Sequence, residues 1–202
     1  MKSISLIILL LLPILLHGQE ISVKSYQEGL DACKQIVSDN QKKSPDKFIY
    51  TGPDCMIGAT MPQFIGTTFE GRQVSPDYFR GKITVLNFWQ ISCPPCIAEI
   101  PGFNAVIDKY GHDRFNYLAI GLDDADDINR FLKNHPWGFS QLSNGSKMIF
   151  DVFKMGWGFP TTFVINEDGV IVAAFSGGET DDNASEELED KLTKIIEGLI
   201  KK

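Results

Sequence analysis

The segment Val85–Pro101, with the sequence VLNFWQISCPPCIAEIP, constrains the fold more than any other part of the chain. It begins with apolar residues that favour a β-strand, continues with two cysteines separated by two prolines, and then takes on helical spacing. Pro95 favours a helix start here, because a proline at the first helical position sacrifices no hydrogen bond. A strand that leads into two cysteines at the start of a helix indicates sulfur chemistry.

The spacing of Cys93 and Cys96 places both thiols on the first turn of the predicted helix. The unpaired N–H groups and the dipole at a helix N-terminus stabilise a thiolate. Because the thiolate is the attacking species in disulfide exchange, we assign Cys93 as the nucleophile and Cys96 as the thiol that resolves the mixed disulfide. Pro94 and Pro95 remove two backbone donors near the sulfur, which favours a reducing rather than an oxidising potential.

A stable structural disulfide and half of a metal site are the alternatives for this cysteine pair. A four-ligand zinc site needs further ligands at suitable spacing. Cys33 and Cys55 lie far upstream, and neither has a second cysteine three residues away. His112 and His135 are the only histidines beyond residue 18. We therefore expect no metal, and nothing in the sequence calls for another cofactor.

Residues 1–18 have the pattern of a secretory signal peptide. Lys2 precedes the almost purely aliphatic run Ile4–Leu16, which is shorter than a typical membrane span. Cleavage after Gly18 fits this pattern, although Leu16 is large for its position before the cleavage site. We expect an exported protein, periplasmic in a bacterium, with no membrane span in the mature chain. The alternative is an uncleaved N-terminal segment that anchors the protein to the membrane.

Composition and charge fit a globular protein that does not bind nucleic acid. The hydrophobic fraction of 43% and the aromatic fraction of 11% are sufficient for a sizeable core. The formal net charge is −7, whereas a nucleic-acid-binding surface is basic. Disulfides persist in exported proteins, but four cysteines in a chain of 202 residues do not make a disulfide scaffold.

Apolar periodicity divides the chain into an N-terminal extension, residues 19–57, and an α/β domain, residues 58–202. The extension contains an amphipathic helix, and a short β-hairpin is predicted near residues 64–75. From Ile83 the predicted order is β-α-β-α-β-α-β-β-α. Strands joined through helices predict parallel pairing with right-handed crossovers. A turn at Asn166–Gly169 joins the last two strands and predicts an antiparallel edge.

Three further residues are candidates for the site. Pro160 directly precedes a predicted strand and follows two glycines, so the peptide bond before it is either cis or an ordinary trans bond at a strand start. Glu99 lies one helical turn after the second cysteine, where a partly buried carboxylate exchanges a proton with the resolving thiol, unless it is a solvated helix residue. Asn87 lies in an otherwise apolar strand and either hydrogen-bonds locally or lines the space under the dithiol.

Together these motifs resemble the thioredoxin superfamily, and more closely the extracytoplasmic TlpA/ResA-like thiol-disulfide oxidoreductases, near the AhpC/TSA and redoxin families. The resemblance covers about residues 58–202. It rests on Phe88-Trp89, the CPPC motif, Glu99 with Pro101, the run GFPTTF at 158–163, and Asp168-Gly169. It implies an α/β, thioredoxin-like fold in which helices flank a central mixed β-sheet. The N-terminal β-hairpin and the short helical extension complete this expected architecture.

The resemblance also implies roles for individual residues. It implies a cis peptide bond at Pro160 that faces the dithiol, where neighbouring backbone pairs with the substrate chain. It implies that Glu99 tunes the dithiol, which gives a catalytic set of Cys93, Cys96, Glu99 and Pro160. The predicted substrate groove is bordered by Trp89, Ser92, Phe159 and Thr161. Relatives usually have an aromatic residue in place of Ser92, and Phe159 is bulky for its position, so these two leave the choice of partner open.

We expect an exported thiol-disulfide oxidoreductase that reduces protein disulfides and receives its electrons from an upstream membrane donor. A peroxidase of the peroxiredoxin type is the alternative enzyme, but residues 87–92 lack the proline and the Thr or Ser that such enzymes need before their reactive cysteine. The non-enzymatic alternative is a metal carrier or binding module on a thioredoxin scaffold, although copper-carrying relatives have a wider cysteine spacing. Cys33 and Cys55 lie outside the resemblance and either form a structural disulfide or remain free thiols.

Overall fold

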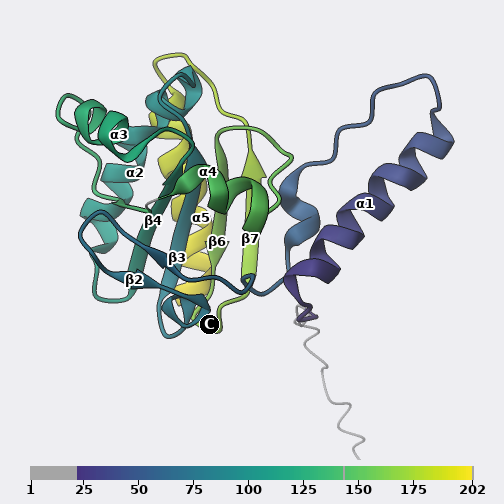
Figure 1. Cartoon of the computed structure of the whole chain (residues 1–202), viewed down its shortest axis with the longest axis horizontal. Helices are drawn as coiled ribbons and strands as arrows, with labels where there is room; N and C mark the ends of the chain where they lie inside the picture. Colours follow the sequence, from purple (N-terminus) through teal and green to yellow (C-terminus); the bar gives the residue numbers. More distant parts are fainter. Residues whose placement is uncertain (1–21, 143, 202) are drawn as a thin grey trace, which may run out of the picture.

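The computed structural model describes residues 22–142 and 144–201, so the predicted signal peptide and its cleavage site lie outside the described residues. A five-stranded mixed sheet forms the centre of the molecule (Figure 1). Its spatial order is β5-β4-β3-β6-β7. The strand bounds are β3 Ile83–Trp89, β4 Phe115–Gly121, β5 Ser140–Gln141, β6 Thr161–Ile165 and β7 Ile171–Ser176. The predicted central mixed sheet is confirmed.

The direction of β6 corrects one expectation from the sequence. β3, β4 and β5 are mutually parallel, as predicted, but β6 runs antiparallel to β3 although a helical segment connects it to β5. That segment contains α4 (Gly145–Lys147) and the π-helical turn Met148–Val152. It stays at the end of the sheet where β3 ends, so that Thr161 pairs with Phe88. A parallel crossover would have returned the chain to the opposite end of the sheet.

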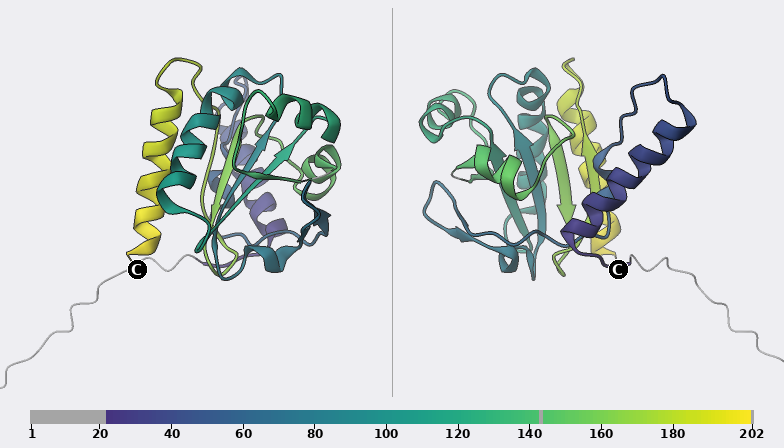
Figure 2. Two further views of the ribbon diagram at one scale, coloured as in Figure 1. Left: turned by 90° about the vertical axis from the view of Figure 1, so that its left-hand side faces the viewer. Right: turned by 45° about the vertical axis from the view of Figure 1, so that its right-hand side comes forward.

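Two helices cover one face of the sheet. α2 (Pro94–Tyr110) and α5 (Ala184–Ile200) lie side by side on this face (Figure 2, left). The apolar cluster beneath them includes Val85, Trp89, Ile100, Phe103, Leu188 and Leu192. The opposite face has its own cluster, which includes Leu86, Phe88, Leu118, Phe153 and Phe163. Because β3 is covered on both faces, all seven of its residues are buried, which explains its nearly continuous apolar sequence.

Shorter elements complete the domain. The predicted N-terminal hairpin consists of β1 (Gly66–Thr67) and β2 (Gln73–Val74), which pair antiparallel. A 3-10 turn, Pro76–Phe79, follows it. α3 (Ala125–Leu132) lies after β4, and its buried Ile128 joins the cluster beneath α2 and α5. Among the described residues, no helix is long and apolar enough to cross a bilayer.

The segment predicted to form the N-terminal extension contains α1 (Tyr26–Lys43), whose first turn is closed by a capping box between Ser25 and Glu28. The start of α1 packs on the domain, because Tyr26 is buried and its hydroxyl donates to the carbonyl of Phe153 at 2.9 Å. The far end of α1 and the segment after it project away from the sheet (Figures 1 and 2). This segment returns to the domain through the 3-10 turn Pro53–Met56.

A disulfide ties the two ends of this projecting segment together. Cys33 of α1 is bonded to Cys55 of the 3-10 turn, with 5.2 Å between their Cα atoms. Of the two possibilities that the sequence left open for this pair, the structure contains the disulfide. It closes a covalent loop that spans 22 residues of sequence.

Candidate active site

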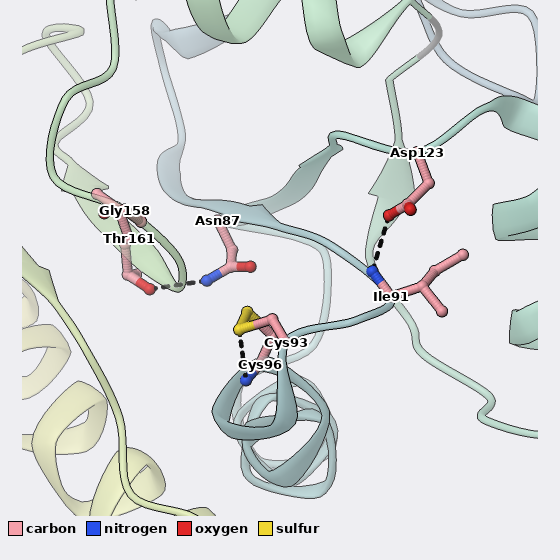
Figure 3. The surroundings of a disulfide bond; sticks show 8 residues. Asn87, Ile91, Cys93, Cys96, Asp123, Gly158 and Thr161 are labelled. Carbon is pink, nitrogen blue, oxygen red and sulfur yellow. Dashed lines mark hydrogen bonds between the residues drawn. A yellow bond between two sulfur atoms is a disulfide. The ribbon is translucent and has the colours of Figure 1, made fainter.

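The two cysteines of the CPPC motif lie where β3 passes into α2. Cys93 is the N-cap residue of α2, and Cys96 lies in its first turn. They form a disulfide, with 5.3 Å between their Cα atoms (Figure 3). The amide of Cys96 donates to Sγ of Cys93 at 3.3 Å. One N–H group of the helix N-terminus therefore lies at the sulfur of Cys93, in an arrangement that stabilises a thiolate after reduction.

Both cysteines of the pair are buried. Cys93 retains 5% of its surface and Cys96 only 2%. Ser92 and Pro94 on either side of Cys93 are exposed, so the approach from solvent leads to Cys93.

The loop that carries the dithiol is held by a residue that the sequence analysis did not single out. Asp123 accepts a hydrogen bond from the amide of Ile91 through Oδ2 at 2.7 Å (Figure 3). Beside it, the amide of Leu122 donates to the carbonyl of Trp89 at 2.9 Å. The sequence signal that could have identified Asp123 was the predicted parallel pairing of β3 and β4. This pairing brings the loops that follow the two strands together.

Pro160 lies at the same end of the sheet as the dithiol loop. The peptide bond between Phe159 and Pro160 is cis, as the resemblance implied. Thr161, the next residue, pairs with Phe88 near the end of β3. Just before this bond, Gly158 has a positive φ of 81°, and its carbonyl accepts a hydrogen bond from the Thr161 hydroxyl at 2.8 Å. The turn at Gly158 and the strand pairing thus fix Pro160 at this end.

The four residues that were expected to border the substrate groove differ in their exposure to solvent. Ser92 is exposed and Phe159 is partly exposed, so both are open to a partner. Trp89 and Thr161 are each 0% exposed, and their assignment to the groove is wrong. The indole of Trp89 points into the core and donates to Oε1 of Gln141 at 3.1 Å. The Thr161 backbone pairs with strands on both sides, and its hydroxyl donates a hydrogen bond to the Gly158 carbonyl.

Glu99 is buried rather than solvated. It lies on α2 with 4% of its surface exposed, and Oε2 has no hydrogen-bond partner among the described residues. Burial raises the pKa of this carboxyl to about 8, against the opposing positive charge of Lys191 on α5. A carboxyl with this pKa takes up and releases a proton near neutral pH, which suits it to the proton of a thiol one turn away.

Glu99 lines a cavity of about 470 Å³. It is lined by Glu99, by Phe175 and Gly178 around the end of β7, and by Leu188 and Lys191 of α5. Nζ of Lys191 lies 3.8 Å from the centre of the Phe175 ring. Desolvation lowers the pKa of Lys191, while the Glu99 charge acts in the opposite direction. Sequence reasoning missed Lys191 and Gly178, because their separation from Glu99 along the chain leaves no local pattern.

Asn87 takes up one of its two expected arrangements. It is 1% exposed, and its Nδ2 donates to Oγ1 of Thr162 on β6 at 2.9 Å (Figure 3). Its side chain therefore joins β3 to β6 beneath the loops of the site. This satisfies a buried amide within the sheet.

No three His, Cys, Asp or Glu side chains gather as metal ligands within residues 22–142 and 144–201. All four cysteines are instead taken up by the two disulfides. The site is thus a dithiol–disulfide pair with a buried carboxyl behind it.

Comparison with known proteins places this geometry in a family. Residues 57–174 match the AhpC/TSA family. The chain belongs to this family. It is 32% identical over 143 residues to the thiol-disulfide oxidoreductase ResA of Bacillus thuringiensis subsp. konkukian, which covers 69% of this chain and 78% of the relative. ResA of Geobacillus thermodenitrificans is 27% identical over 134 residues, or 66% of this chain and 76% of the relative.

Solved structures agree with this assignment. A putative thiol:disulfide interchange protein DsbE from Chlorobium tepidum superposes with a TM-score of 0.60 at 24% identity, over 71% of this chain and 97% of that one. StoA from Bacillus subtilis gives a TM-score of 0.51 at 25% identity, over 63% and 93% of the two chains. The fold is therefore thioredoxin-like. The chain is a thiol-disulfide oxidoreductase of the TlpA/ResA-like group of the thioredoxin superfamily.

Proposed function

We propose that this enzyme is exported and reduces disulfides in other proteins through Cys93 and Cys96. The observation that carries the proposal is the position of Cys93, a slightly exposed N-cap residue whose sulfur accepts the amide N–H of its own partner cysteine. A thiolate on Cys93 is stabilised there, and the exposed neighbours Ser92 and Pro94 leave it an approach from solvent.

The reaction begins with attack of the Cys93 thiolate on one sulfur of a substrate disulfide. A bond forms between Cys93 Sγ and that sulfur, the substrate disulfide breaks, and the other substrate sulfur leaves as a thiolate. Cys96 then attacks Cys93 Sγ, which releases the remaining substrate sulfur and forms the Cys93–Cys96 disulfide. The dithiol has then given two electrons to the substrate.

Glu99 has a role in the second of these steps. Cys96 attacks as a thiolate, so its thiol proton moves to a base first. Glu99 lies one helical turn away, and its pKa of about 8 leaves part of the carboxyl ionised near neutral pH to accept that proton. Cis-Pro160 lies at the same end of the sheet, where neighbouring backbone is available to pair with the substrate chain.

Export is supported by the sequence of residues 1–18, and we extend the proposal to the division of the chain. A signal peptide covers 1–18, the extension covers 19–57, and the thioredoxin-like domain covers 58–202. In a bacterium the enzyme works in the periplasm, either free or anchored by an uncleaved N-terminal segment. A membrane donor upstream returns two electrons to the Cys93–Cys96 disulfide after each turnover.

Insulin reduction with single-cysteine variants tests the proposal. Cys93→Ser abolishes turnover, because no nucleophile remains. Cys96→Ser accumulates mixed disulfides with its substrates, because nothing resolves them. The double variant Cys33→Ser/Cys55→Ser is the matched control and retains turnover. Insulin reduction by Cys93→Ser at the wild-type rate would refute the mechanism.

The reduction potential of the Cys93–Cys96 pair tests the direction of electron flow. A value near that of thioredoxin, about −270 mV, supports a reductase. A value near about −120 mV, in the strongly oxidising range, contradicts it. Equilibration with a thiol redox buffer followed by alkylation measures it, and the Cys33→Ser/Cys55→Ser variant removes any contribution from the other pair.

A further inference from the structure

A groove of about 790 Å³ lies between α1 and the segment that follows it, outside the redox site. Its lining is mainly apolar and includes Leu30, Val37, Phe48, Ile49 and Trp157. Phe48 is 92% exposed, and Tyr50 at the groove is 57% exposed. Together these neighbouring side chains form a contiguous exposed apolar surface, which is typical of a site that binds a partner.

The charged side chains that line this groove are lysines. Lys34, Lys42 and Lys154 line it, and no Asp or Glu does, although the whole chain has a net charge of −7. Lys34 and Lys42 each lie close to an aspartate three residues earlier on the exposed surface of α1. Lys154 has no such carboxylate within the part of the chain that the structure describes. Lys154 therefore offers a positive charge to a carboxylate that lies beside the apolar part of a ligand in the groove.

One end of the groove reaches the loop that carries cis-Pro160. The hydroxyl of Tyr50 donates to the carbonyl of Trp157 at 3.2 Å and lies 2.5 Å from Oγ of Ser176 at the end of β7. Trp157 lines the groove and precedes Pro160 by three residues, which span at most about 11 Å of chain. This end of the groove therefore lies next to the loop that leads to cis-Pro160.

We propose that this groove binds an extended segment of the substrate protein, apolar in its centre and flanked by acidic residues, and so holds the substrate disulfide at Cys93. This inference deepens the proposed function and rests on it. A polypeptide fits these observations better than a lipid, because the groove leads to the cis-Pro loop, and only a chain that also carries the disulfide gains from that connection. The groove then contributes to substrate choice, while the chemistry stays at the dithiol.

Two cyclic disulfide peptides of the same ring sequence provide the test. One carries an apolar tail flanked by glutamates, and the other carries a Gly/Ser tail of equal length. For the wild-type enzyme we expect kcat/KM to be about tenfold higher for the apolar-tailed peptide, through KM, as burial of one large apolar side chain produces. Phe48→Ser and Lys154→Glu each reduce this preference. Phe150→Ser, an exposed phenylalanine that does not line the groove, preserves it.

Equal kcat/KM values for the two peptides with the wild-type enzyme would overturn the groove proposal. An unchanged preference in Phe48→Ser would overturn it as well. Failure of the redox function is separately visible, because the enzyme then reduces neither peptide. Binding is therefore also measured with redox-inert peptides in which serine replaces cysteine. The signal is the fluorescence of Trp157, and the Trp157→Phe variant gives the background from the other tryptophans. Binding of oleate, together with no binding of the apolar-tailed peptide, would assign the groove to lipid and refute the proposal.

Discussion

A Cβ atom added at Gly178 would lie 2.6 Å from Oε1 of Glu99. Gly178 belongs to the segment between β7 and α5, whereas Glu99 lies on α2. The missing side chain at residue 178 therefore makes the space that the buried carboxyl occupies. The same added atom would lie in van der Waals contact with Cβ of Pro95, inside the CPPC motif, at 3.4 Å.

Gly178→Ala is expected to displace the carboxyl of Glu99 and slow the resolving step of catalysis. The added methyl group occupies space now taken by Oε1, so the carboxyl turns away from its present position. A carbon-detected NMR titration reports the shifted Glu99 pKa, and single-turnover kinetics report the slower release of substrate. Gly198→Ala is the control, because an added Cβ there meets no atom within 4 Å. A titration curve in Gly178→Ala identical to that of the wild type would contradict this prediction.

Lys191→Met is expected to raise the pKa of Glu99 above its value of about 8. The Lys191 charge favours the ionised carboxylate, so its removal favours the protonated acid. The same NMR titration measures the change. Lys194→Met, three residues further along α5 and outside the cavity, should leave the Glu99 pKa where it is. The prediction fails if the two lysine variants titrate alike.

Glu99 is expected to make the oxidised protein less stable as the pH rises from about 5 to about 8. Its folded-state pKa of about 8 lies above its ordinary value of 4.5, so in this range the folded protein keeps a proton that the unfolded chain has lost. The stabilisation from Glu99 is complete below the ordinary pKa of 4.5 and is lost as the pH rises through the folded-state pKa of about 8. The free energy of unfolding then falls by a total on the order of a few kcal/mol. Urea unfolding of the wild type and of Glu99→Gln measures it. The Gln variant should lack this component, and parallel pH profiles for the two proteins would refute the assignment.

The double variant Cys33→Ser/Cys55→Ser is expected to lower the stability of α1 by about 3 kcal/mol, since it removes the closure of a 22-residue loop. The far end of α1 contributes little to the domain core, so the effect should be concentrated there. Amide hydrogen exchange locates the change, with faster exchange expected in α1 and little change in β3. Uniform acceleration throughout the sheet would contradict a local role for this bond.

The parts of the site that are adjacent in sequence were predictable from the sequence. A strand, a CPPC motif and a helix follow one another directly, so Cys93 and Cys96 could be assigned from local pattern alone. Pro160 is different, because the sequence left both isomers of its peptide bond open and only the family resemblance selected cis. Strands β3 and β4 were predictable from their apolar runs and the helix between them.

What sequence could not provide was the direction of side chains and the contacts between distant segments. Trp89 looked available to a substrate because it lies close to the dithiol, but the pleat of β3 points it into the core against Trp137, with 5.1 Å between ring centres. Lys191 and Gly178 reach Glu99 only through the packing of α5 on α2. The antiparallel course of β6 depends on where its preceding loop runs, which apolar periodicity does not encode.

The Cys33–Cys55 bond also has a consequence for proteolysis. Most of the groove lining, from Lys34 to Thr51, lies between the two bonded cysteines. A protease that cuts once between residues 34 and 54 therefore leaves both fragments covalently joined, and the nicked chain separates on a gel only after reduction. Such a nicked enzyme would keep the intact protein's mass apart from one added water.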